Sequence, residues 1–154
     1  MSTTPPDKPP LKLSGFLTFR LSRLQAQINS QAQYILSTHS DIGQTEWRVM
    51  ILVADVGQST MAAVVREGQI DKAQVSRAVK SLIRKEYMDS HVDPSDHRQS
   101  ILALTASGRA LYDRVLPMMR ERQKVLMADL SEDEVATVFS VLDRLEAAAQ
   151  RRDF

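Results

Sequence analysis

Residues 71–88 read DKAQVSRAVKSLIRKEYM, and this stretch decides the fold that we expect for the whole chain. Asp71 and Gln74 form a variant of the capping box that opens a helix. The apolar residues that follow recur three or four positions apart, as on the inward face of an amphipathic helix of about 15 residues. They are Val75, Ala78, Val79, Leu82 and Ile83.

The outward face of this predicted helix is basic. No acidic side chain occurs from residue 72 to residue 85, although the chain holds 19 Asp and Glu residues and has a net charge of only +1. Any attraction to a polyanion must therefore come from the local placement of positive charge. The basic residues are Lys72, Arg77, Lys80, Arg84 and Lys85.

Three further helices are predicted upstream. The apolar spacing over residues 13–39 predicts a long first helix. A second helix is expected over residues 43–57, with glycine as its N-cap and Glu46 at its third position. A short third helix is expected over residues 60–67, after which the chain turns at Gly68.

A hairpin and two helices are predicted downstream. Residues 93–104 read DPSDHRQSILAL, in which the Asp-Pro-Ser-Asp run favours a turn and the rest alternates as a strand does. We therefore expect a two-stranded hairpin over residues 88–104. Thr105 is expected to cap a fifth helix, which Pro117 should kink, and SEDE at residues 131–134 is a capping box for a sixth.

A short helix, a turn, a basic helix and a hairpin follow one another in a winged helix-turn-helix. The expected fold class is therefore mainly α with a small two-stranded β-wing. In such a unit the second helix enters the major groove of DNA, where side chains near its N-terminal half meet base edges. Gln74, Ser76 and Arg77 lie there, while Lys80 and Arg84 follow and are expected to hold phosphates.

Three stretches resemble one known family. TEWRVMILVAD at residues 45–55, the basic helix at 71–88 and DPSDHRQSILALTASGRAL at 93–111 together resemble the MarR family of transcriptional regulators. The third stretch is similar to the family's wing, in which two aspartates and an arginine precede a strand that ends in Leu-Thr. The resemblance extends over about residues 13–149.

The resemblance implies a homodimer that binds double-stranded DNA through two lobes. Its interface would be built by N- and C-terminal dimerisation helices, which are the first, fifth and sixth predicted here. It also implies a small-molecule effector, usually aromatic or phenolic, that releases a repressor from DNA. In the wing, Arg98 falls where the family's arginine enters the minor groove, Asp96 where a carboxylate steadies it, and His97 where a second basic residue is common.

The sequence departs from the family pattern at several positions. Gly68 lies one position before the expected turn glycine, and Val65 replaces the usual alanine, so the angle between the helices should differ slightly. Glu86 stands where a glycine usually closes the basic helix. His97 weakens one phosphate contact at neutral pH, because an unperturbed imidazole is mostly uncharged there.

Candidate effector residues lie on the first two predicted helices. Trp47 and Met50 could border a pocket, although an aromatic residue at helical spacing more often belongs to plain core packing. Arg20 and His39 could hold a ligand carboxylate, because cationic groups form strong hydrogen bonds to carboxylates. The alternative for these two side chains is solvation, or pairing with acids across the dimer.

Two other interpretations stay open. One is a metal-dependent hydrolase, but two of its four candidate ligands lie at or past the hairpin tip, and no phosphate-binding loop, nucleophile elbow or His-Glu-x-x-His motif is present. An enzyme is therefore not expected. The other is a helical dimerisation protein that does not bind DNA, as would follow if the altered turn spoiled docking. The candidate metal ligands are His91, Asp93, Asp96 and His97.

The chain of 154 residues has the length of one domain. Residues 1–10 hold four of its six prolines, so residues 1–12 should form a mobile arm. The expected organisation is a dimerisation helix at 13–42, the winged helix-turn-helix at 43–104 and C-terminal dimerisation helices at 105–154, in a single compact domain.

The absence of cysteine excludes disulfides, thiolate metal sites and thiol-based redox sensing within this chain. No leader sequence and no apolar run long enough to span a membrane is evident. We therefore expect a cytoplasmic protein with no cofactor and no membrane partner.

Overall fold

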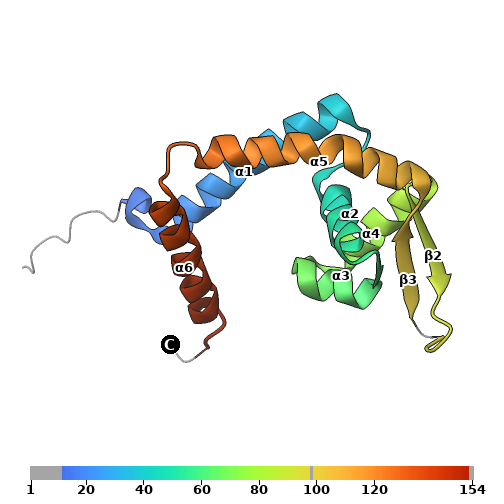
Figure 1. Ribbon diagram of the computed structural model, residues 1–154. Helices are drawn as coiled ribbons and strands as arrows, with labels where there is room; N and C mark the ends of the chain where they lie inside the picture. The colour runs from blue at the N-terminus through green and yellow to red at the C-terminus, as the bar shows by residue number, and fades with distance from the viewer. Residues whose placement is uncertain (1–11, 98, 153–154) are drawn as a thin grey trace, which may run out of the picture. The chain divides into compact units, whose positions relative to one another are not determined.

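The computed structural model describes residues 12–97 and 99–152 (Figure 1). Its fold is mainly α with a small antiparallel sheet, as the sequence predicts. The Pro-rich arm expected at residues 1–12 lies almost entirely outside the described residues. In chain order the elements are η1 (Leu13–Gly15), α1 (Leu17–His39), α2 (Gln44–Val56), β1 (Gln58–Thr60), α3 (Met61–Gly68), α4 (Lys72–Arg84), β2 (Met88–Val92), β3 (Ser100–Leu104), α5 (Ala106–Met127) and α6 (Glu132–Ala149).

The predicted caps begin the helices. At the start of α2 the Gly43 amide donates to Oε2 of Glu46 (2.6 Å), which is the one half of a capping box that a glycine N-cap can form. The Thr60 hydroxyl accepts a hydrogen bond from a backbone amide in the first turn of α3. At α6 the Glu134 amide donates to the Ser131 hydroxyl (3.3 Å). Each cap satisfies amides that would otherwise lack a partner at a helix start.

The helix-turn-helix is built around one apolar core. Burying each aliphatic side chain of such a core contributes about 1.5–3 kcal/mol to the free energy of folding. This burial keeps the apolar face of α4 turned inward and so fixes the rotation of the helix about its own axis. Ile83, which the helical spacing placed inward, is instead 39% exposed, because it lies about 100° around the helix from Leu82 at the edge of the buried face. The buried residues of these elements are Trp47, Val49, Met50, Val53, Val64, Val75, Ala78, Val79, Leu82, Met88 and Leu102.

The predicted hairpin is present, and a third short strand joins it. Strand order is β1-β3-β2, and both pairs are antiparallel. In the hairpin Met88 lies opposite Leu104 and Val92 opposite Ser100. On the other side of β3, Gln58 lies opposite Ala103. The sheet therefore connects the segment before α3 with the wing.

The ends of α3 and α4 both use left-handed residues that are not glycine. Gln69 has a φ of 46° and ends α3, so the turn comes one residue after Gly68, where the family resemblance places its glycine. Gly68 serves packing instead, because a Cβ there would lie 2.9 Å from side-chain carbons of Leu52 and Ile70. Glu86 has a φ of 60° just after α4, at the position where the resemblance also places a glycine.

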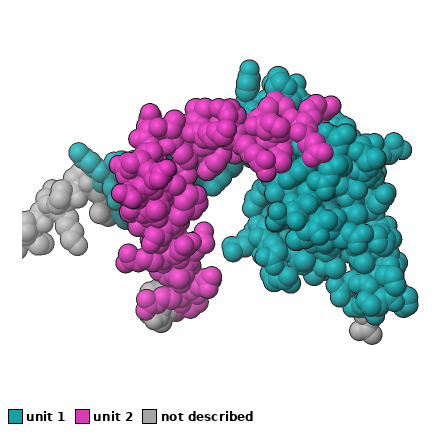
Figure 2. Space-filling model, in the orientation of Figure 1, with its two compact units in different colours: residues 1–112 teal, residues 113–154 magenta. Residues whose placement is uncertain are grey.

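The chain divides into two compact units, residues 1–112 and 113–154, so the division falls inside α5 (Figure 2). In the first unit the Gly108 amide donates to the Thr105 hydroxyl (3.0 Å) at the start of α5. In the second unit no residue of α6 is buried, and Phe139 is half exposed. Within the described residues, no helix combines the length and the apolar character needed to cross a bilayer.

Candidate nucleic-acid interface

The outward face of α4 presents the side chains that the sequence assigns to DNA binding. Gln74, Arg77, Lys80 and Arg84 are exposed, while Ser76 is partly buried. The buried face of the same helix packs on α2 and α3 in the first unit (Figure 1). The structure therefore brings these five residues together on one helix, and the packing of the opposite face on α2 and α3 holds that helix in place.

Asp71 holds the start of α4. Its Oδ1 accepts hydrogen bonds from the amides of Ala73 (2.9 Å) and Gln74 (3.2 Å). A free helix start attracts phosphate through such amides, but here a carboxylate already occupies them. The positive potential of this surface therefore comes from Lys and Arg side chains.

Lys85, the last residue of the basic run, does not belong to the exposed face. Its ammonium donates to Oε1 (3.0 Å) and Oε2 (3.2 Å) of Glu46 and to the backbone carbonyl of Asp41. The side chains of Lys85 and Glu46 are only 22% and 13% exposed. The charge pattern alone did not distinguish Lys85 from Arg84, because its partner lies 39 positions away in the sequence.

The wing turn is organised by two carboxylates. Oδ1 of Asp93 accepts from the hydroxyl (2.6 Å) and the amide (2.8 Å) of Ser95, and these hydrogen bonds hold the pKa of the Asp93 carboxyl below its ordinary value. The Gln99 side-chain amide donates to Oδ2 of Asp96 (2.8 Å). His97 is exposed at the turn. Arg98, the expected minor-groove residue, lies outside the described residues, so its role stays a prediction.

The candidate metal ligands of the wing are spread along it. His91 lies on β2 opposite Ile101, and Asp93 is held by Ser95 at the turn. Across residues 12–97 and 99–152, no group of three His, Asp or Glu side chains is arranged to hold a metal ion.

The four candidate effector residues occupy two different environments. Trp47 is 5% exposed and stacks on Tyr112, with ring centroids 5.5 Å apart and an interplanar angle of 27°. Met50 is fully buried. Arg20 and His39 are exposed on α1, where Arg20 lines a surface hollow. Trp47 and Met50 therefore belong to the core of the first unit, and Arg20 and His39 lie at the surface.

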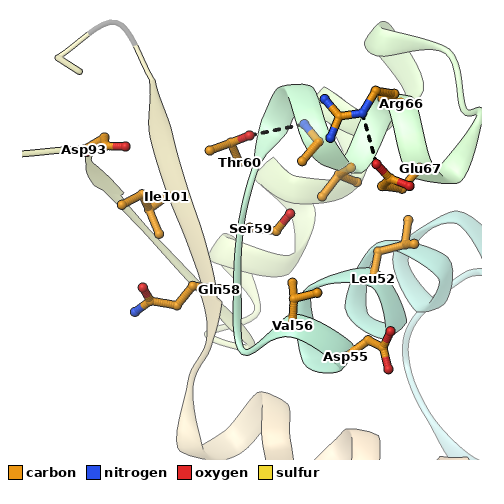
Figure 3. Close-up of a pocket in the computed structure, with 12 residues that line it drawn as sticks. Leu52, Asp55, Val56, Gln58, Ser59, Thr60, Arg66, Glu67, Asp93 and Ile101 are labelled. Atoms are coloured by element: carbon orange, nitrogen blue, oxygen red, sulfur yellow. Dashed lines mark hydrogen bonds and ion pairs between the residues drawn. The ribbon is translucent and has the colours of Figure 1, made fainter. Parts of the chain in front are cut away.

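A pocket of about 640 Å³ lies elsewhere in the first unit, between the end of α2, β1, α3 and the wing (Figure 3). Figure 3 shows Asp93 and Ile101 on the wing side, across from Thr60 and Val56. Arg66 on α3 pairs with the neighbouring Glu67 at 3.0 Å. The sequence did not reveal this pocket, because its walls come from separate segments that share no motif.

Comparison with known proteins agrees with this geometry. Residues 40–99 match the sequence profile of the MarR family. Over 91 residues the chain is 30% identical to the HTH-type transcriptional repressor NicR of Pseudomonas putida. The aligned region covers 59% of this chain and 58% of NicR. The match thus spans little more than half the length of that relative.

Two solved structures share the fold over most of the chain. A MarR/EmrR family transcriptional regulator from Acinetobacter sp. ADP1 has a TM-score of 0.85 and 25% identity, over 92% of this chain and 100% of its own. BpsR of Bordetella bronchiseptica, whose DNA binding is regulated by 6-hydroxynicotinic acid, has a TM-score of 0.81 and 22% identity, over 89% of this chain and 97% of its own. The segment that matches the family profile contains the basic helix, its turn and most of the wing, and the fold is similar to that of a solved MarR/EmrR family regulator.

Proposed function

We propose that this chain is a sequence-specific DNA-binding transcriptional repressor and has no enzymatic activity. The main observation is the exposed basic face of α4, opposite a buried face that fixes the helix in place. The major groove is about as wide as a helix, so a helix held in this way can present its cations to both bases and phosphates.

The proposed contacts divide into two kinds. Gln74, Ser76 and Arg77 lie in the first two turns of α4 and meet base edges, where a two-pronged arginine contact to guanine discriminates by about 1–3 kcal/mol. Lys80 and Arg84 follow along the helix and neutralise phosphates. We also assign the minor-groove contact to the wing, through the residues Asp96, His97 and Arg98.

The proposed active form is a homodimer. On α1 large apolar side chains are exposed, among them Leu17 (51%) and Leu24 (47%). On α6 the same holds for Phe139 (50%) and Val141 (43%). Large exposed apolar surfaces are typical of protein interfaces. A two-fold dimer would bind a pseudo-palindromic operator with half-sites about 34 Å apart.

The proposed release signal is a small aromatic or phenolic acid. The relative BpsR, which responds to 6-hydroxynicotinic acid, supports this class of ligand. Arg20 and His39 would bind the carboxylate, and Trp47 and Met50 would border the ring. Because Trp47 and Met50 are buried, a ring reaches them only if the packing around them opens, and this would couple binding to a conformational change.

DNA titration tests the proposal. The purified protein is titrated against the fragment upstream of its own gene and against random DNA of equal length, over a range of salt concentrations. We expect the upstream fragment to bind at least about 10³-fold more tightly, with an affinity that falls steeply with salt. Equal and weak binding to both would instead favour a helical dimerisation protein that does not bind DNA.

The effector is tested on the same complex. Adding 6-hydroxynicotinic acid or a related phenolic acid should release the upstream fragment, whereas an aromatic amine of the same size should not. The double variant Arg20→Ala, His39→Ala should keep its DNA affinity and lose the response. A response that survives in this variant would place the ligand elsewhere.

A further inference from the structure

Residues 85–87, directly after α4, are tied on one side to the α1–α2 connection and the first turn of α2, and on the other side to the start of α5. We propose that this segment fixes the angle at which α4 meets DNA, and that Lys85 is a positioning residue and not a DNA contact. The inference rests on the DNA-binding role proposed above for α4.

The first tie joins the segment to Asp41 in the α1–α2 connection and to Glu46 in the first turn of α2. The Lys85 ammonium lies between the Glu46 carboxylate, at 3.0 and 3.2 Å, and the Asp41 carbonyl. The Tyr87 hydroxyl donates to Oδ1 of the same Asp41 (3.0 Å). An ammonium has three donors, and acceptors within the protein engage those of Lys85. Lys85 is therefore occupied internally, whereas Arg84 beside it is exposed.

The second tie joins the segment to the start of α5. The Thr105 hydroxyl donates to the Glu86 carbonyl (2.7 Å), and the Thr105 amide donates to the Tyr87 carbonyl (3.2 Å). Gly108 packs against the same peptide so closely that a Cβ would lie 1.9 Å from the Tyr87 carbonyl oxygen. This contact leaves the segment no room to shift toward α5.

The end of α4 is itself closed by backbone hydrogen bonds. The Glu86 amide donates to the Ile83 carbonyl (2.9 Å), and the Tyr87 amide donates to the Leu82 carbonyl (2.9 Å). The left-handed conformation of Glu86 turns the chain at this point. The two ties therefore hold the helix itself and not a flexible tail.

These contacts restrain α4 at the end that follows its DNA-facing residues. A helix tied to two elements at one end cannot tilt unless one of the ties breaks. Base contacts depend on such restraint, because a binding group must be held within about 0.5 Å and 10–20° of its working geometry. Loss of the Lys85 tie should therefore reduce discrimination between DNA sequences more than overall attraction to DNA.

The test compares Lys85→Met, Glu46→Gln and the double variant with two controls, all in the full-length protein. Lys85→Arg keeps the charge. Lys124→Met removes a lysine whose pair with Glu121 (3.3 Å) is exposed, with side chains 76% and 65% accessible. The main measurement is the ratio of affinities for the upstream fragment and for random DNA, well below each unfolding temperature. Hydrogen exchange of the amides of residues 81–87 is measured in parallel without DNA.

We expect Lys85→Met and Glu46→Gln each to lower the ratio about tenfold. The double variant should lose little more, because both changes break one bridge. Lys85→Arg should keep most of the ratio, and Lys124→Met all of it. Affinity for random DNA should change little, because Lys85 is not proposed to contact a phosphate. Loss of a phosphate contact would instead weaken binding to every sequence alike. An unchanged ratio in Lys85→Met, or an equal loss on both DNAs, overturns the proposal.

Failure of the proposed function gives a different result. If the wild-type protein shows no preference for the upstream fragment, the proposed repressor role is wrong. Hydrogen exchange then still tests whether Lys85 holds residues 85–87 in place. Faster exchange of the amides of residues 85–87 in Lys85→Met than in Lys124→Met then supports the tie. Equal exchange in the two variants overturns it.

Discussion

Glu86 adopts a backbone conformation that glycine adopts more easily. Its φ of 60° costs an L-residue roughly 1–2 kcal/mol, while a glycine there would lose about 0.5–1 kcal/mol through its freer unfolded state. We therefore expect Glu86→Gly to raise the free energy of unfolding by up to about 1.5 kcal/mol. Urea unfolding at constant protein concentration measures it.

The matched control is Glu121→Gly, at an exposed position in the interior of α5. A glycine in a helix interior costs about 1 kcal/mol, so this variant should lose stability. Equal destabilisation by both substitutions would contradict the account of Glu86.

Glu46 should make the stability of the protein sensitive to acid. Burial acts to raise the pKa of its carboxyl, but hydrogen bonds from the Gly43 amide, Ser81 and Lys85, with the Lys85 charge, outweigh burial and hold that pKa below its ordinary value. A lowered pKa gives stability that is complete above the unfolded-state value and is lost as the pH falls through the folded-state value.

We expect the contribution of Glu46 to disappear as the pH falls below about 4.3. Glu46→Gln should therefore be less stable than the wild type at neutral pH, and should lose less stability on acidification. Urea unfolding of both proteins at pH 7 and near pH 3.5 measures the two losses. Equal losses of stability in the two proteins would show that the ion pair between Glu46 and Lys85 does not contribute to the free energy of unfolding.

At the scale of the element, two positions of α4 should behave differently on DNA. Arg77→Ala should cost about 1–3 kcal/mol on the upstream fragment and relax the preference at one base pair. Lys80→Ala should weaken binding to all sequences and lower the magnitude of the salt slope by about 1. Affinities at several salt concentrations separate the two. The same behaviour in both variants would contradict the assignment of base and phosphate contacts.

The sequence predicts helices best where each helix begins at a cap formed by residues close together in the sequence. Gly43 with Glu46, Thr60 and Ser131 with Glu134 cap helices where expected, because each cap acts within three positions. β1 was not predicted, since its three residues become a strand only by pairing with β3, more than 40 positions later. The turn after α3 falls at Gln69, which takes the left-handed conformation, while Gly68 lies closely against side-chain carbons of Leu52 and Ile70.

At the scale of the molecule, the exposed apolar side chains of α1 and α6 predict a dimer. Light scattering should give twice the mass of the chain at micromolar concentration. Phe139→Arg should raise the dimer dissociation constant at least about tenfold, because a buried aromatic side chain often dominates an interface. Val92→Arg, at an exposed apolar position in the wing, is the control and should leave the mass unchanged. A monomeric wild-type protein would contradict the dimer.

The candidate interface could be predicted only in part. The exposed cations of α4 follow from helical periodicity and a local excess of charge, both of which are visible in the sequence. The contrast between Arg84 and Lys85 was not visible, because it depends on Glu46 and Asp41, which only folding brings close. Trp47 and Met50 are buried, a result that helical spacing alone leaves open.

A footprint on the upstream fragment tests whether two copies of α4 lie in successive major grooves. Bound protein should protect two major-groove segments, related by pseudo-two-fold symmetry and about 34 Å apart along the helix axis. Protection should also extend to the minor groove beside each segment, where the wing is proposed to bind. A single protected segment without symmetry, or no protection at concentrations where the protein is dimeric, would contradict the account.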